Sequence, residues 1–142
     1  AARRAQLFSR LDEVSRVLRA GNYAEAETRL RTLLDEYKGE PRVLFAMGQT
    51  WSAAAADAVN EETRDDRLGR ALANYRLAIS AADRELDRPL LSRAYVAAGR
   101  ILAFLERADE AAQMFDAALA LGEVPDGAYR DAVDERKKLQ QP

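Results

Sequence analysis

Cysteine and histidine are both absent from this chain of 142 residues. Without cysteine there is no disulfide and no thiolate metal site, and the redox compartment stays open. Without either residue, the chain cannot form a nucleophilic triad or use an imidazole as a general base. No Gly-rich phosphate-binding motif is present. We therefore predict no catalytic residue, no cofactor and no metal ion, because an enzyme would need acid-only or metal chemistry for which no site is evident.

Long apolar runs and an excess of one charge are also missing. No apolar segment is long enough to span a bilayer, and 22 basic residues against 24 acidic ones give a net charge of −2. This near balance gives no indication of nucleic-acid binding. We expect a soluble chain, cytoplasmic or periplasmic, that neither binds nucleic acid nor inserts into a membrane.

Proline, glycine and aromatic residues are few, with four prolines, seven glycines and 7% aromatics, although 48% of the residues are hydrophobic. Much of the apolar content is alanine, which favours helices and lets them approach closely. Runs of β-branched residues are absent. The composition predicts an all-α chain, long enough for one domain with its own core.

Apolar residues recur at helical spacing along most of the chain. The last predicted helix follows Asp126, which we expect to cap it, and extends to about Leu139. Before it, two helices share the stretch from Ala94 to Pro125, with a polar bend at Glu106–Asp109. The earlier predicted helices are Ala2–Arg19, Tyr23–Tyr37, a third from Pro41 to about Asn60, and Arg64–Leu86.

Small residues stand where the two helices of the Ala94–Pro125 stretch must approach closely, and Phe115 follows Ala111 by four positions. This spacing resembles the tetratricopeptide repeat, which has W-x2-L-G-x2-Y on its first helix and A-x3-F, then a later Pro, on its second. The residues at these positions are Tyr95, Ala98, Gly99 and Leu102, then Ala111, Phe115 and Ala118.

Earlier parts of the chain match the same pattern with a longer period. Val14 and Gly48 are 34 residues apart, which is one repeat length. Gly48 precedes Ala71 by 23 residues, whereas Gly99 precedes Ala111 by 12. The difference is about three helical turns. We expect both helices of the middle hairpin to share it.

The resemblance implies a right-handed superhelical stack of three helix-turn-helix hairpins with a C-terminal capping helix. Residues 1–142 would then form a single domain, with repeats at about 7–40, 41–88 and 92–125 and the capping helix at 126–140. In this family the first helices of the repeats line a concave groove that holds a peptide or a helix. The implied function is non-catalytic protein binding, as an interaction module or scaffold.

Alignment with the family selects groove residues from each repeat, of which several are Arg and none is acidic. An Arg fork can hold a carboxylate bidentately, and aromatic residues can contact an apolar side chain. We therefore expect a protein or peptide partner with apolar and acidic residues. The candidates are Arg19, Arg42, Phe45, Gln49, Arg93, Val96, Arg100 and Phe104, with Phe8 and Ser15 beside them.

Other interpretations remain open. Trp51 is expected in the core between hairpins, although it could instead stack against a ligand. The acidic cluster at Glu61, Glu62, Asp65 and Asp66 is expected to be a solvated turn rather than a cation site. The chain could also self-associate as a homo-oligomer, or serve as a docking or regulatory domain of a larger protein, which the missing N-terminal Met suggests.

Overall fold

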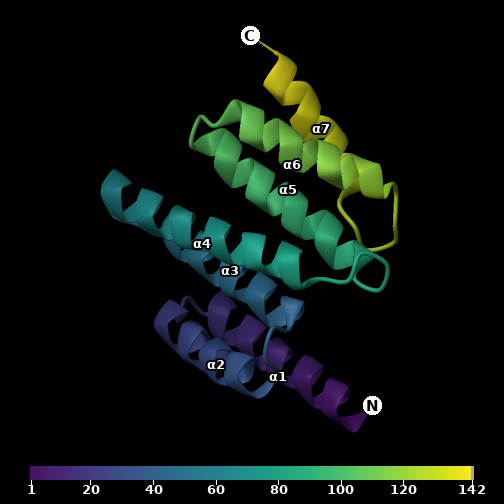
Figure 1. Ribbon diagram of the computed structural model, residues 1–142. Coiled ribbons are helices and arrows are strands. Elements are labelled where there is room, and N and C mark those ends of the chain that lie inside the picture. Colours follow the sequence, from purple (N-terminus) through teal and green to yellow (C-terminus); the bar gives the residue numbers. More distant parts are fainter. Residues whose placement is uncertain (142) are drawn as a thin grey trace. The chain divides into compact units, whose positions relative to one another are not determined.

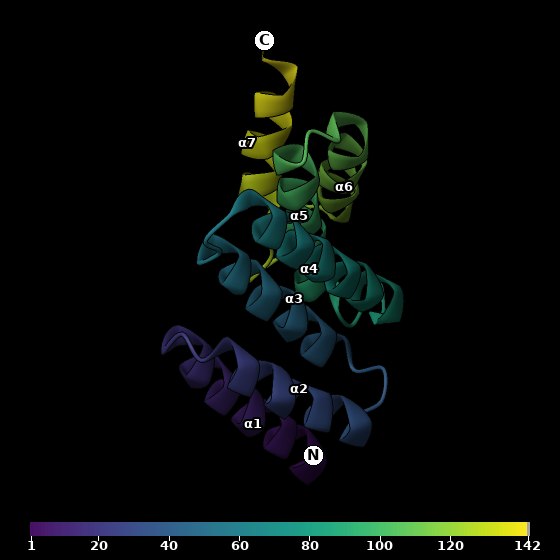
Figure 2. The same cartoon turned by 90° about the vertical axis from the view of Figure 1, so that its left-hand side faces the viewer.

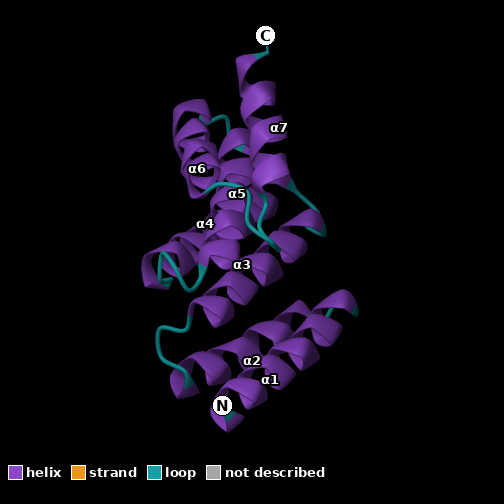
Figure 3. Cartoon of the chain, turned by 90° about the vertical axis from the view of Figure 1, so that its right-hand side faces the viewer, coloured by secondary structure: helices purple, strands orange, loops and turns teal. Residues whose placement is uncertain are grey.

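The computed structural model describes residues 1–141, and over this range it contains seven α-helices and no strand (Figures 1 and 3). The predicted all-α class is therefore confirmed. The helices in chain order are α1 (Ala2–Arg19), α2 (Tyr23–Glu36), α3 (Pro41–Ala56), α4 (Glu61–Ala81), α5 (Arg88–Phe104), α6 (Ala108–Leu121) and α7 (Tyr129–Gln140).

The chain divides into two compact units, Ala1–Asn74 and Tyr75–Pro142. In the first unit, α1 and α2 pack together as a helical hairpin, and α3 contacts both of them (Figure 2). Contact of each new helix with both members of the preceding hairpin is the packing expected of stacked helical repeats. The core of this unit contains Leu7, Val14, Ala26, Leu30, Leu33, Val43 and Met47.

The second unit repeats this arrangement with α5 and α6 as the hairpin and α7 in contact with both. Two of its helices approach closely at Gly99, where an added Cβ would lie 2.4 Å from Cε1 of Phe115. Phe115 is fully buried, as are the neighbouring Ala111 and Ala118. The prediction that small residues allow a close approach here is confirmed at Gly99, because no larger residue would fit beside this ring.

The start of α7 is positioned by Ser92, a fully buried polar residue of α5. The backbone N–H of Ala128 donates to Oγ of Ser92 at 2.8 Å, and the helix begins one residue later. The expectation that Asp126 caps this helix is wrong. Asp126 lies in the preceding turn with a φ of 63°, so the capping helix starts at Tyr129 rather than at residue 126.

Two helix ends around α4 also differ from the prediction. The α3 helix ends at Ala56, and Oδ1 of Asn60 accepts the N–H of Thr63 at 2.7 Å, which places Asn60 at the start of α4 instead of in a continued α3. At the other end, α4 stops at Ala81 and does not reach Leu86. The carboxylate of Asp83 accepts the N–H of Leu86 at 2.8 Å and so favours a turn.

The extra length of the middle segment is shared unequally by its two helices. The α3 helix continues for eight residues after Gly48, whereas α5 continues for five after Gly99. The α4 helix begins ten residues before Ala71, whereas α6 begins three residues before Ala111. The expectation that both helices share the excess is therefore confirmed, and the larger part lies in α4, which the Asn60 cap starts early.

Candidate binding surfaces

Two of the residues selected from the family resemblance meet in the first unit. Phe8 of α1 is 43% exposed, and the guanidinium carbon of Arg42, from the start of α3, lies 5.8 Å from its ring centroid. A second guanidinium, that of Arg4, lies 5.3 Å from the same centroid. We call Phe8, Arg4 and Arg42 the Phe8 cluster. It presents a partly exposed aromatic ring with two cations beside it, which is a composition common at protein interfaces.

Arg42 also stabilises its own helix. Its backbone N–H and its side chain both donate to the carboxylate of Glu40, at 3.0 and 3.1 Å. Glu40 caps α3, and Pro41 takes the first helical position. The Arg42 guanidinium is thus partly neutralised and only 20% exposed. Arg4 is the more accessible cation of the Phe8 cluster.

The other candidates of the first unit are not all accessible. Arg19, Gln49 and Ser15 are exposed, and Arg19 lies in the last turn of α1. Phe45, by contrast, is buried with 8% of its surface exposed. A ligand could contact Arg19 and Gln49 directly, but Phe45 would have to leave its packing first.

In the second unit, α7 occupies part of the surface that the alignment selects on α5. The Arg100 guanidinium lies 3.6 Å from a carboxylate oxygen of Asp131 and 3.7 Å from one of Glu135, both on α7. Val96 is buried at 2% exposure. Arg93 is exposed and donates to the carbonyl of Pro89 at 3.4 Å, and Phe104 is 55% exposed at the end of α5.

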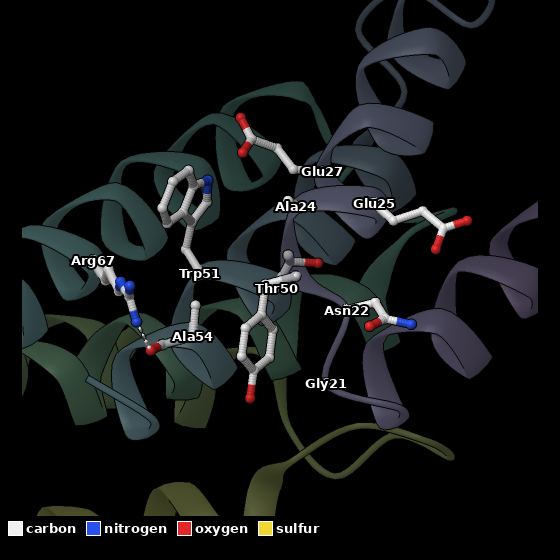
Figure 4. Close-up of a pocket in the computed structure, with 10 residues that line it drawn as sticks. Gly21, Asn22, Ala24, Glu25, Glu27, Thr50, Trp51, Ala54 and Arg67 are labelled. Atoms are coloured by element: carbon white, nitrogen blue, oxygen red, sulfur yellow. Dashed lines mark hydrogen bonds between the residues drawn. The ribbon is translucent and has the colours of Figure 1, made fainter. Parts of the chain in front are cut away.

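A pocket that the alignment does not select lies in the first unit. It has a volume of about 700 Å³ and lies among the α1–α2 turn, the first turns of α2, the C-terminal half of α3, and Arg67 of α4 (Figure 4). Trp51 forms one wall and is only half-buried, so its expected place in the core is not what the structure shows. The single Trp of the chain was the one available sequence signal for this pocket.

The edges of the pocket are held by hydrogen bonds and cation–π contacts. The Arg67 guanidinium donates to the carbonyl of Ala54 at 2.6 Å, and the Arg70 guanidinium lies 5.0 Å from the Trp51 ring centroid. The hydroxyl of Tyr23 donates to the carboxylate of Asp57. This bond raises the pKa of Tyr23 above its ordinary value, and desolvation and the negative charge of Asp57 act in the same direction.

The acidic cluster at the start of α4 is paired with arginines. Nε of Arg64 lies 3.1 Å from Asp65, and Nε of Arg70 lies 3.1 Å from Asp66. Among residues 1–141, no group of three or more acidic side chains is arranged to hold a metal ion. Over the same range, no helix combines the length and the apolar character that crossing a membrane requires.

The described residues thus define an all-α protein of packed helical hairpins with two candidate surfaces in the first unit. No known protein-family model matches the chain, and no curated protein or solved structure matches it. The likeness to tetratricopeptide repeats therefore depends on the residue spacing given above and stays a prediction.

Proposed function

We propose that the chain is a non-catalytic protein-binding module, and that the Phe8 cluster contacts a partner peptide or helix with apolar and acidic side chains. The observation that carries the proposal is the exposed Phe8 ring with a guanidinium 5.3 Å and another 5.8 Å from its centroid. An apolar partner side chain would cover the ring, and a carboxylate would approach the guanidiniums.

The packing of the unit supports this proposal. The cluster combines residues from α1 and α3, two helices that contact each other in addition to α2. A surface made from two packed helices holds its side chains at fixed separations, which lowers the entropy cost of binding. Stacked helical hairpins commonly use such first-helix surfaces for recognition.

The carboxyl groups whose pKa is lowered have local structural partners. The carboxyl groups with a lowered pKa are Glu36, which accepts a hydrogen bond from Arg10, and Asp83, which accepts backbone N–H groups of Leu86 and Glu85. Both are surface groups with a local structural partner. Neither resembles a general acid or base, whose pKa is shifted by burial in a cleft.

A random peptide library displayed on phage tests the proposal, because it requires no knowledge of the natural partner. Panning on the wild-type chain should enrich peptides with apolar and acidic residues. Synthetic copies should bind at least about tenfold more weakly to Phe8→Ala, since exposed aromatic anchors dominate interfaces. Arg4→Glu should weaken the same peptides through charge repulsion.

Arg84→Glu is the matched control, because Arg84 is exposed in the second unit and its reversal changes the net charge equally. Far-UV circular dichroism verifies that each variant keeps its helices. Enriched peptides that bind Phe8→Ala and Arg4→Glu as tightly as the wild type would refute the role of the Phe8 cluster. Light scattering over a concentration range tests the alternative of self-association in the same samples.

A further inference from the structure

The pocket beside Trp51 is large enough to take side chains of a partner. Its volume of about 700 Å³ falls within the range of roughly 300–1,000 Å³ that is typical of binding pockets. Small residues create this space, since Ala24 and Ala54 stand where longer side chains would fill it. Their methyl groups and the indole of Trp51 provide an apolar interior.

The Arg70 guanidinium lies over the Trp51 ring. It covers part of one face of the indole, and that face is therefore only partly available to a ligand. Within the described residues, the indole Nε1–H of Trp51 donates to no protein acceptor. In Figure 4 the carboxylate of Glu27 extends toward the side on which Trp51 lies, and Glu25 extends away from it. On the Trp51 side of the pocket, an indole donor and the Glu27 carboxylate thus lie beside the apolar interior.

Among the residues that line the pocket, two carry a carboxylate, Glu25 and Glu27. Glu25 is paired with Arg29 at 3.0 Å, and Asp57, beside the pocket, accepts the hydroxyl of Tyr23. The only cation among the lining residues, Arg67, is directed to the carbonyl of Ala54. The Glu27 carboxylate beside an apolar interior favours a partner that carries a positive charge.

The carboxylate of Glu27 can accept such a partner at little cost. It pairs at 2.5 Å with Arg31, whose side chain is 69% exposed and four residues further along α2. Pairs at this spacing on a helix surface contribute little to stability, and here the Arg31 end of the pair lies in solvent. A partner cation held next to the indole can therefore replace Arg31, which would return to solvent.

We propose that the Trp51 pocket binds a peptide segment in which an apolar side chain stands next to lysine or arginine. The apolar side chain enters between Trp51 and Ala24, and the cation pairs with Glu27. This inference rests on the proposed function, protein binding, and adds a second surface. Its preference is opposite in charge to that of the Phe8 cluster, so one partner could contact both surfaces through different residues.

The same phage-displayed library separates the two surfaces when it is panned on pocket variants. Ala24→Leu fills the pocket with a residue that favours helices, and Glu27→Gln removes only the charge. Asp35→Asn is the matched control, since it removes one exposed acidic charge elsewhere on α2. Because Trp51 is the only Trp of the chain, its fluorescence reports directly whether a synthetic peptide free of Trp occupies the pocket.

The expected result is a class of peptides with an apolar residue beside lysine or arginine. These peptides should change the Trp51 emission, lose at least about tenfold in affinity with Ala24→Leu, and lose about threefold with Glu27→Gln. Raising the salt concentration should remove the Glu27→Gln effect. Asp35→Asn should leave their binding unchanged, and the helicity of every variant should equal that of the wild type.

Three results would overturn the inference, and they differ in what they say about the proposed function. Peptides that all require Phe8 and tolerate Ala24→Leu would remove the pocket and leave protein binding in place. Peptides that need the pocket but are acidic would refute the charge preference. Failure to enrich any peptide would overturn both the pocket and the proposed function.

Discussion

The replacement of Gly99 by alanine gives the sharpest test of the packing in the second unit. The new methyl carbon would lie 2.4 Å from Cε1 of Phe115 and 2.8 Å from its Cδ1. Carbon atoms in contact are normally about 3.5–4.0 Å apart, so the ring or the helix must move by about 1 Å. Phe115 is fully buried, and there is no adjacent solvent into which its ring could turn.

The expected magnitude is the difference between two effects. Overpacking of this kind costs about 1–3 kcal/mol. Alanine recovers about 0.8–1 kcal/mol over glycine in the interior of a helix. Because the contact is shorter than any real Cβ contact and involves a buried ring, we expect Gly99→Ala to lower the free energy of unfolding by about 1–2 kcal/mol. Urea unfolding followed by circular dichroism measures this value.

Gly69→Ala is the matched control, because Gly69 also lies inside a helix and its added Cβ would meet nothing within 4 Å. It should stabilise the chain by about 0.5–1 kcal/mol through helix propensity alone. In a Phe115→Leu background, Gly99→Ala should lose most of its cost, since the smaller side chain leaves room. A Gly99→Ala chain at least as stable as the wild type would refute the close approach.

Two further predictions concern single hydrogen bonds. Ser92→Ala should cost about 1–3 kcal/mol, because the N–H of Ala128 loses its acceptor, and faster hydrogen exchange confined to α7 would verify it. Arg10→Ala should raise the pKa of Glu36 toward the ordinary value of a glutamate, since the hydrogen bond from Arg10 is the main cause that lowers it. The bond stabilises the fold at a pH above the pKa that Glu36 has in the unfolded chain. This stabilisation is lost as the pH falls through the lower pKa that Glu36 has in the folded chain. An unchanged Glu36 titration by NMR would contradict the assignment.

Much of the fold could be predicted from residue spacing. The bounds of α1 and the first residues of α2 and α3 agree with the prediction, because glycine and proline interrupt an otherwise regular apolar pattern there. The helix ends at Asn60, Asp83 and Asp126 were less predictable. Each depends on whether a polar side chain or a distant serine satisfies the local backbone, and propensity does not contain this information.

The candidate site could be predicted only in part. Alignment selected Phe8 and Arg42, which do meet, because residues at corresponding places on adjacent first helices lie close when hairpins stack. It also selected Val96 and Phe45, which are buried. A side chain on a first helix can face solvent or the next helix, and the choice depends on how that helix is rotated in its packing.

The sequence by itself determined that the chain is helical, where most hairpins begin, and that Gly99 must lie against another helix, because these follow from local propensity and short-range spacing. Only the tertiary structure decided that α7 pairs with Arg100, that most of the extra residues of the middle segment fall in α4, and that Trp51 borders a pocket. Those features depend on how residues from different helices fill or leave space between them, and no periodicity within one helix contains that information.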